Sequence, residues 1–121
     1  MRTRPDAVTT ITLPSGPVRV DEAGYLTDPE QWTRDFAMLV AEQEEIALRE
    51  LHWQVIAFMR SHLDEHGIAA DARIVLKFLG EKLGVNKASA KQALFELFPY
   101  GYVQQACKMA GMRQPRAWST G

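Results

Sequence analysis

The stretch ARIVLKFLGEKLGVNKASAKQALFELF, residues 72–98, decides the fold because it contains two amphipathic helical runs with one short break between them. The break falls at Gly84, which can adopt the left-handed backbone that ends a helix, and Asn86 follows as an N-cap. Two helices joined by so short a turn form a helix-turn-helix outline. We therefore predict a mainly α-helical domain with this pair in its core.

The helix-turn-helix outline suggests DNA binding as one function. Lys87 and Lys91 would point outward from the second helix, and lysine side chains can contact phosphates. Glu96 on the same helix would repel DNA, however, and Phe95 and Phe98 are expected to be buried. Because such helix pairs also serve as plain packing units, DNA binding stays an alternative function.

Two longer helices are expected upstream of this pair. The first has Thr27 or Asp28 as its cap and an amphipathic pattern over residues 29–46. The second covers residues 49–66, and Gly67 offers a left-handed stop. Apolar side chains occupy much of the circumference of this second helix, so we expect it to pack centrally on several neighbours.

The first part of the chain has the pattern of a β-hairpin. TTITL and PVRV contain alternating β-branched residues on either side of a Pro-Ser-Gly break, which assigns a hairpin region to residues 1–20. The whole chain, residues 1–121, is expected to form one domain. Its length suffices to bury a modest core without a metal or a disulfide.

Composition limits the setting and the partners. The single cysteine, Cys107, cannot form an internal disulfide, which favours a cytoplasmic location. The sequence has no apolar segment of bilayer length and no apolar signal core, so we expect no membrane contact. From residue 86 onward, five lysines and arginines accompany one glutamate, although the chain has a net charge of -1. This basic part could contact phosphates or an acidic protein surface, or could simply face solvent.

The sequence contains no recognisable enzyme motif. His62 and His66 have a spacing that can hold a metal ion, but neither an HExxH motif nor a third ligand accompanies them. Their position near a helix end also suits the helix dipole. His52 could serve as a base for Cys107, although their distance in sequence leaves that geometry open. We expect no metal site and no cofactor.

Residues 102–111, YVQQACKMAG, predict a short last helix that Gly111 ends. Cys107 shares an inward face with Ala106 and Ala110. A buried cysteine is commonly inert, and a reactive one needs partial exposure near a positive charge. Spacing alone therefore favours a structural role for Cys107.

Several short motifs, taken in order, resemble the DsrC/TusE family of sulfur-relay proteins. They are GYL (residues 24–26), HW (52–53), FMR (58–60), Arg73, LFPYG (97–101) and QACKMAG (105–111). The last two motifs are specific when they occur together in one frame. The resemblance extends over about residues 21–115.

The resemblance implies a helical domain with an N-terminal β-hairpin, a helix-turn-helix-like core and a flexible C-terminal arm, residues 112–121. Family members carry sulfur as a persulfide on a penultimate cysteine in this arm. They take the sulfur from a donor complex of the TusBCD or DsrEFH type and pass it to an acceptor protein. The pathway is tRNA thiolation in the TusE branch and dissimilatory sulfur metabolism in the DsrC branch.

The sequence departs from the family pattern in the arm. Cys107 matches a second, helix cysteine of the DsrC branch, but the arm cysteine would fall near Trp118, and the penultimate residue is Thr120. A persulfide needs a thiolate sulfur, so neither residue can carry one. Tyr102 also stands where the family has proline.

Two functions therefore remain within a sulfur-relay setting. In the first, a sulfurtransferase-like carrier uses Cys107 as its catalytic thiol. In the second, a non-transferring adaptor or regulator keeps the docking surface, and Trp118 fills the partner pocket that the arm cysteine otherwise enters. We expect partner contacts at Arg73, Lys77, Lys108 and Trp118, of which Arg73 and Lys108 lie in the motifs that carry the resemblance. Whether the protein is an enzyme depends on access to Cys107.

Overall fold

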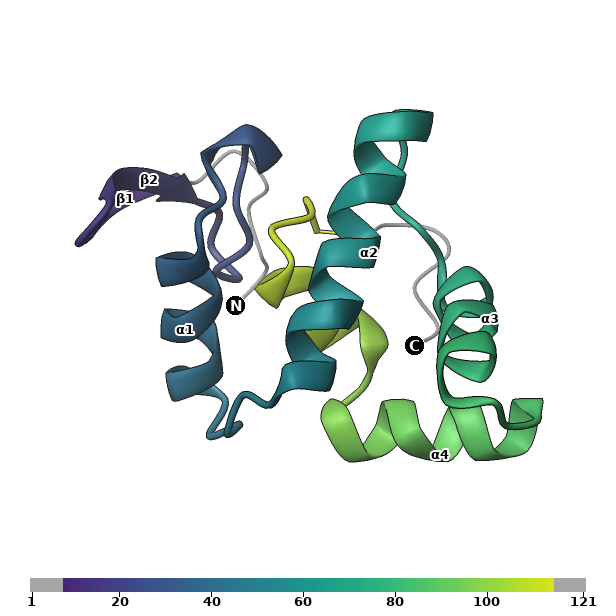
Figure 1. Cartoon of the computed structure of the whole chain (residues 1–121). Helices are drawn as coiled ribbons and strands as arrows, with labels where there is room; N and C mark the ends of the chain where they lie inside the picture. The colour runs from purple at the N-terminus through teal and green to yellow at the C-terminus, as the bar shows by residue number, and fades with distance from the viewer. Residues whose placement is uncertain (1–7, 115–121) are drawn as a thin grey trace.

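The computed structural model describes residues 8–114 and places one long helix, α2, at the centre of the molecule (Figure 1). Along the chain the elements are β1 (Thr9–Leu13), β2 (Gly16–Val20), the 3₁₀ turn η1 (Pro29–Gln31), α1 (Arg34–Gln43), α2 (Glu50–His66), α3 (Ala72–Leu83), α4 (Lys87–Leu97) and the π-helical segment η2 (Tyr102–Cys107). The hairpin and α1 lie on one side of α2, and α3 and α4 lie on the other. The predicted mainly α-helical fold with an N-terminal hairpin is confirmed.

The helix-turn-helix pair forms as the sequence predicts. The Asp71 side chain caps α3 by accepting a hydrogen bond from the Ile74 amide, and Gly84 ends α3 with a φ of 67°. The Asn86 side chain caps α4 by accepting a hydrogen bond from the Ser89 amide at 2.9 Å. Each cap and stop is a local signal, which is why these boundaries could be predicted closely.

The hairpin strands are antiparallel and lead into a tight turn. The Asp21 carboxylate accepts hydrogen bonds from the amides of Ala23 and Tyr25, as aspartate does in side-chain-stabilised turns. A backbone bridge then joins Val20 to Leu26. This bridge directs the chain back along the hairpin toward η1.

The prediction of one continuous helix over residues 29–46 is wrong. Asp28 does cap this run, but the chain makes only the 3₁₀ turn η1 before Trp32 adopts an extended conformation. Thr33 then acts as a second N-cap by accepting a hydrogen bond from the Phe36 amide, and α1 begins. The break leaves the Trp32 indole free to reach the C-terminal part of the fold.

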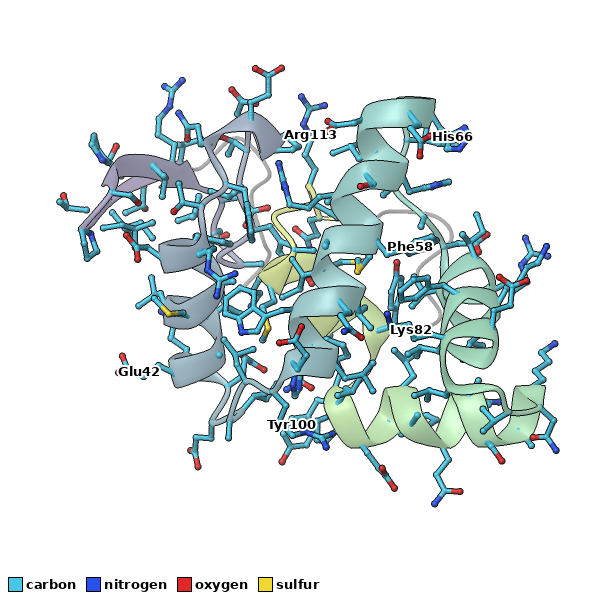
Figure 2. The ribbon with its side chains drawn as sticks, in the orientation of Figure 1. Glu42, Phe58, His66, Lys82, Tyr100 and Arg113 are labelled. Carbon is cyan, nitrogen blue, oxygen red and sulfur yellow. The ribbon has the colours of Figure 1, made fainter. Side chains whose placement is uncertain are left out.

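The hydrophobic core surrounds α2. Phe58 of α2 stacks on Phe78 of α3 with ring centroids 4.3 Å apart, and Figure 2 shows Phe58 between these helices. Fully buried side chains from the other elements include Phe36, Leu79, Leu97 and Met109. No helix within residues 8–114 combines the length and the apolar character needed to cross a bilayer.

One core prediction on α4 is wrong. Phe98 is buried as expected, but the Phe95 side chain is 51% exposed. Successive residues of an α-helix are about 100° apart around its axis, and α4 turns Leu94 and Leu97 inward. Phe95 is therefore left on the outer face of the helix.

Candidate functional site

Cys107 lies at the end of η2, inside the core. Its side chain is enclosed, with an exposed fraction of 0%. Ala106 and Ala110 are also buried, as their spacing predicts. The backbone is wound as a π-helix here, and the Met112 amide donates a hydrogen bond to the Cys107 carbonyl oxygen at 3.0 Å. The sulfur atom is therefore not accessible from the surface of this conformation.

Burial also changes the acidity of the thiol. Removal from water raises the pKa of Cys107 to about 12, and the neighbouring Tyr102 hydroxyl opposes this rise only in part. The Tyr102 hydroxyl donates a hydrogen bond to the Ala70 carbonyl oxygen, which ties η2 to the start of α3. At neutral pH Cys107 is thus a neutral thiol, whereas the thiolate is the form that attacks a persulfide or a disulfide.

Two side chains, which we call the Trp32–Arg60 clamp, hold the segment that follows η2. The Trp32 indole N–H donates a hydrogen bond to the Met109 carbonyl oxygen at 2.9 Å. The Arg60 guanidinium donates to the carbonyl oxygens of Ala110, at 2.8 Å, and of Pro29, at 2.9 Å. Its central carbon lies 4.6 Å from the centroid of the Trp32 ring, a cation–π distance. The clamp therefore joins η1, α2 and the C-terminal segment.

Gly111 allows the clamp to close. It has a φ of +81°, and a Cβ atom at this position would lie 2.5 Å from Cδ1 of Trp32 and 2.9 Å from a nitrogen of Arg60. Any larger residue would push the clamp apart. The sequence predicted Gly111 only as the end of a helix. It did not predict the Trp32–Arg60 clamp, although Arg60 lies in the FMR motif.

His52 is a structural residue and does not have a free nitrogen with which to act as a base for Cys107. Its Nε2 donates a hydrogen bond to the Leu97 carbonyl oxygen at 2.8 Å, and its Nδ1 accepts one from the Arg49 amide at 3.0 Å. Burial lowers the pKa of His52, and the hydrogen bond to Leu97 offsets this only partly. The imidazole is therefore neutral and joins the start of α2 to the end of α4.

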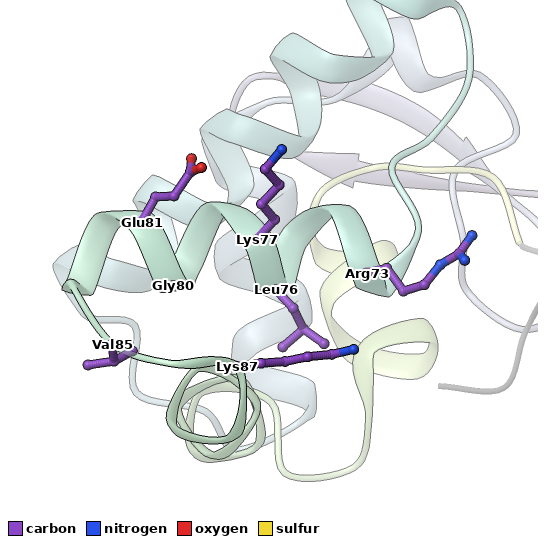
Figure 3. Close-up of a pocket in the computed structure, with 7 residues that line it drawn as sticks. All are labelled: Arg73, Leu76, Lys77, Gly80, Glu81, Val85 and Lys87. Carbon is purple, nitrogen blue, oxygen red and sulfur yellow. The ribbon is translucent and has the colours of Figure 1, made fainter.

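Three of the predicted binding residues meet at one pocket between α3 and α4. This α3–α4 pocket has a volume of about 440 Å³ and is lined by Arg73, Leu76, Lys77, Gly80, Glu81, Val85 and Lys87 (Figure 3). Lys87 extends beneath Leu76 toward the end of α3 that carries Arg73. The structure thus joins two expected partner contacts, Arg73 and Lys77, to a lysine that sequence reasoning had assigned to nucleic acid.

The other predicted site residues lie elsewhere. Lys108 points toward Tyr25, with its Nζ 5.1 Å from the ring centroid, and does not line the α3–α4 pocket. Lys91 is exposed on α4 but is also not part of the pocket. Trp118 falls outside the described residues, as does most of the predicted arm. Met112, the first residue of that arm, is buried.

His62 and His66 lie side by side on α2, with ring centroids 4.4 Å apart. His62 also stacks on Phe58 at 6.3 Å. Between residues 8 and 114, no three histidine, cysteine, aspartate or glutamate side chains gather as metal ligands would. His62 therefore packs against the aromatic residues between α2 and α3, and His66 lies beside it on the exposed surface.

Comparison with known proteins identifies the family. A sequence profile described as "DsrC like protein" matches residues 14–117. The chain belongs to the DsrC-like family. It is 39% identical over 98 residues to the sulfurtransferase TusE homolog of Haemophilus influenzae, which covers 81% of this chain and 89% of that protein. Sulfurtransferase TusE of Escherichia coli strain K12 is 35% identical over 98 residues, with the same coverage of both chains.

Solved structures of DsrC proteins have the same fold as this DsrC-like chain. The NMR structure of DsrC from Allochromatium vinosum has a TM-score of 0.78 at 36% identity, covering 91% of this chain and 97% of that one. The oxidized gamma-subunit of the dissimilatory sulfite reductase from Archaeoglobus fulgidus has a TM-score of 0.77 at 28% identity, covering 90% and 98%. The resemblance expected from the sequence motifs is confirmed.

The motifs that carry the DsrC-like resemblance contact one another. His52 of HW binds the carbonyl oxygen of Leu97 in LFPYG. Arg60 of FMR binds the carbonyl oxygen of Ala110 in QACKMAG. The motifs therefore hold the C-terminal element of the DsrC-like fold against α2.

Proposed function

We propose that the protein takes part in a cytoplasmic sulfur relay by docking to relay proteins, and that it does not carry sulfur on its own thiol. Membership of the DsrC-like family and relatives named sulfurtransferase TusE and DsrC support the relay setting. The enclosure of Cys107, the only cysteine among the 121 residues, supports the second claim, that the protein does not carry sulfur on its own thiol.

Sulfur transfer to Cys107 has clear chemical requirements. A Cys107 thiolate would attack the outer sulfur of a donor persulfide, a new S–S bond would form, and the donor would leave as a thiolate. The thiolate must first form and then meet the donor sulfur. An exposed fraction of 0% and a pKa raised to about 12 oppose both steps.

Docking needs surface contacts instead of a thiol. We assign Arg73, Lys77, Lys108 and Trp118 to partner contact. Arg73 and Lys77 line an open pocket, Arg73 and Lys108 lie in the motifs of the family resemblance, and Trp118 stands near the position of the arm cysteine. The proposed partners are a donor complex of the TusBCD or DsrEFH type and a sulfur acceptor protein. The matching relatives include both TusE and DsrC proteins, so the test must offer partners from both branches.

One observation favours a second candidate function, in which Cys107 carries sulfur after a local opening. Cys107 ends a π-helical segment, and single π-helical turns are frequent at functional sites. In this candidate, the segment after η2 must detach from the Trp32–Arg60 clamp before the donor can reach the sulfur.

The two candidates can be separated by intact-mass measurement. The parent protein and a Cys107→Ser variant, both shown to be folded by circular dichroism, are incubated with a persulfide donor. We expect no gain of a sulfur atom in the folded parent. A gain that is present in the parent and absent from Cys107→Ser would establish the carrier function instead.

The relay setting is tested separately by pull-down. Purified TusBCD-type donor complex and dissimilatory sulfite reductase are each offered to the immobilised protein. We expect one of the two to be retained. If neither is retained, the relay proposal is wrong.

A further inference from the structure

The α3–α4 pocket combines positive charge with an apolar floor. Leu76 is half-buried between the two helices, and Val85 is 39% exposed in the turn that joins them. A Cβ atom at Gly80 would lie 3.3 Å from the Val85 carbonyl oxygen, so the glycine allows this turn to pack closely on α3. Backbone packing thus fixes the apolar floor formed by Leu76 and Val85, and this floor remains accessible to a bound partner.

The cations around this floor are available to a partner. No carboxylate within residues 8–114 forms an ion pair with Lys77 or Lys87. Arg73 pairs with Asp71 at 3.1 Å, but its side chain is 85% exposed and keeps further N–H donors. Glu81 is the one carboxylate in the lining. The pocket therefore has a positive balance that an acidic guest would complement.

The guest must also have an apolar part. Figure 3 shows Leu76 and Lys87 together between the helices, whereas Lys77 and Glu81 extend from the other side of α3. A side chain seated on Leu76 and Val85 would remove their exposed apolar surface from water. Carboxylates on either side of it would then reach Arg73 and Lys87.

We propose that the α3–α4 pocket receives an acidic protein segment that inserts one apolar side chain between its carboxylates. This inference rests on the proposed docking function, since the segment belongs to a relay partner. Nucleic acid fits the pocket less well, because Glu81 lies in the lining and Lys91, the next lysine along α4, lies outside it. The site thus specifies the chemistry of the partner segment.

The test uses NMR titration of the folded full chain with a defined probe. The probe is a synthetic peptide in which aspartates and glutamates flank a central leucine. We expect amide shifts at Gly80, Val85 and Lys87, and an affinity that falls as salt is raised. Two matched peptides, one with amides in place of the carboxylates and one with serine in place of leucine, are expected to bind more weakly.

Two charge reversals on one helix provide the matched control. Lys87→Glu is expected to weaken peptide binding by about tenfold, whereas Lys91→Glu, the same change outside the pocket, is expected to have little effect. The proposal is wrong if the acidic peptide does not bind, if both variants weaken binding equally, or if duplex DNA shifts the same amides at lower concentration than the peptide.

Failure of this inference can be distinguished from failure of the proposed function. If the donor complex or the reductase is retained in the pull-down but the peptide does not bind, docking stands and uses another surface. If the peptide binds as expected but neither relay partner is retained, the pocket recognises acidic segments outside a sulfur relay. Lys87→Glu in the same pull-down connects the two results, because it should reduce retention of the partner.

Discussion

The Trp32 indole N–H donates a hydrogen bond to the carbonyl oxygen of Met109, a residue 77 positions away, at 2.9 Å. This bond fastens the segment that follows Cys107 to the Trp32 side chain. The accessibility of the only thiol in the sequence is therefore linked to a contact made by the N-terminal third of the chain.

Labelling of Cys107 is expected to require unfolding. At pH 8 a thiol with a pKa of about 12 is almost entirely protonated, and the side chain is enclosed. We expect a maleimide to react with the native protein at least about a hundredfold more slowly than with the protein in denaturant. Mass spectrometry over time measures both rates, and comparable rates would contradict the enclosed thiol.

Weakening the clamp is expected to accelerate that labelling. Trp32→Phe removes the indole donor but keeps an aromatic ring, and loss of one hydrogen bond costs about 1 kcal/mol. If labelling occurs through local opening, the rate should rise about fivefold. Trp53→Phe, the same change outside the clamp, is the control and should leave the rate unchanged.

Stability is expected to decline at alkaline pH. The pKa of Cys107 is raised from 9.0 to about 12 on folding, so the unfolded chain loses this proton first as pH increases. The stabilisation is complete below pH 9.0 and is lost by about 1.4 kcal/mol for each pH unit up to about 12. Urea unfolding at several pH values measures how steeply stability falls with pH. Cys107→Ala should make this fall less steep between pH 9.0 and 10.0, a window below the usual tyrosine pKa.

The opposite dependence is expected from His52. Burial lowers its pKa in the folded state, so the unfolded chain binds a proton more readily and stability declines as pH falls below the usual value of 6.5. His52→Gln removes this titration and leaves an amide that can donate to Leu97. We expect a loss of about 1–3 kcal/mol at neutral pH and a flatter acid limb in urea unfolding.

Gly111→Ala is expected to destabilise the fold strongly. The new Cβ would meet Trp32 at 2.5 Å in a backbone conformation with φ +81°, which should cost more than about 2 kcal/mol. Gly67→Ala is a matched control, because Gly67 has φ +73° but nothing within 4 Å of its Cβ position. Thermal unfolding of both variants separates the clash from the backbone strain, and equal losses would rule out the clash.

Local signals made much of the fold predictable. Gly67, Gly84 and Asn86 end or begin helices through their own backbone or side chain, and the structure places all three as the sequence indicates. The inward position of Cys107 also follows from helical spacing. Thr33 is a local N-cap signal of the same kind, which the prediction of one continuous helix passed over. The placement of Trp32 before it was not predictable locally, because its indole is held by Met109 near the other end of the chain.

The candidate site was predictable only in part. Arg73 and Lys77 are one helical turn apart, but Lys87 joins them because α4 folds back on α3, a relation that spacing along the chain does not describe. Phe95 was expected to be buried because it stands in an apolar run. The position of α4 against its neighbours, which selects Leu94 and Leu97, depends on tertiary packing.

The turn at Gly111 gives one position control over the end of the helical segment that carries Cys107. Gly111 has a φ of +81°. The Met112 amide donates to the Cys107 carbonyl oxygen and the Gly111 amide donates to that of Lys108, which are the two bonds of a Schellman motif. A residue that cannot hold this left-handed backbone would break both bonds together. The anchoring of the thiol-bearing backbone thus depends on a residue four positions beyond the cysteine.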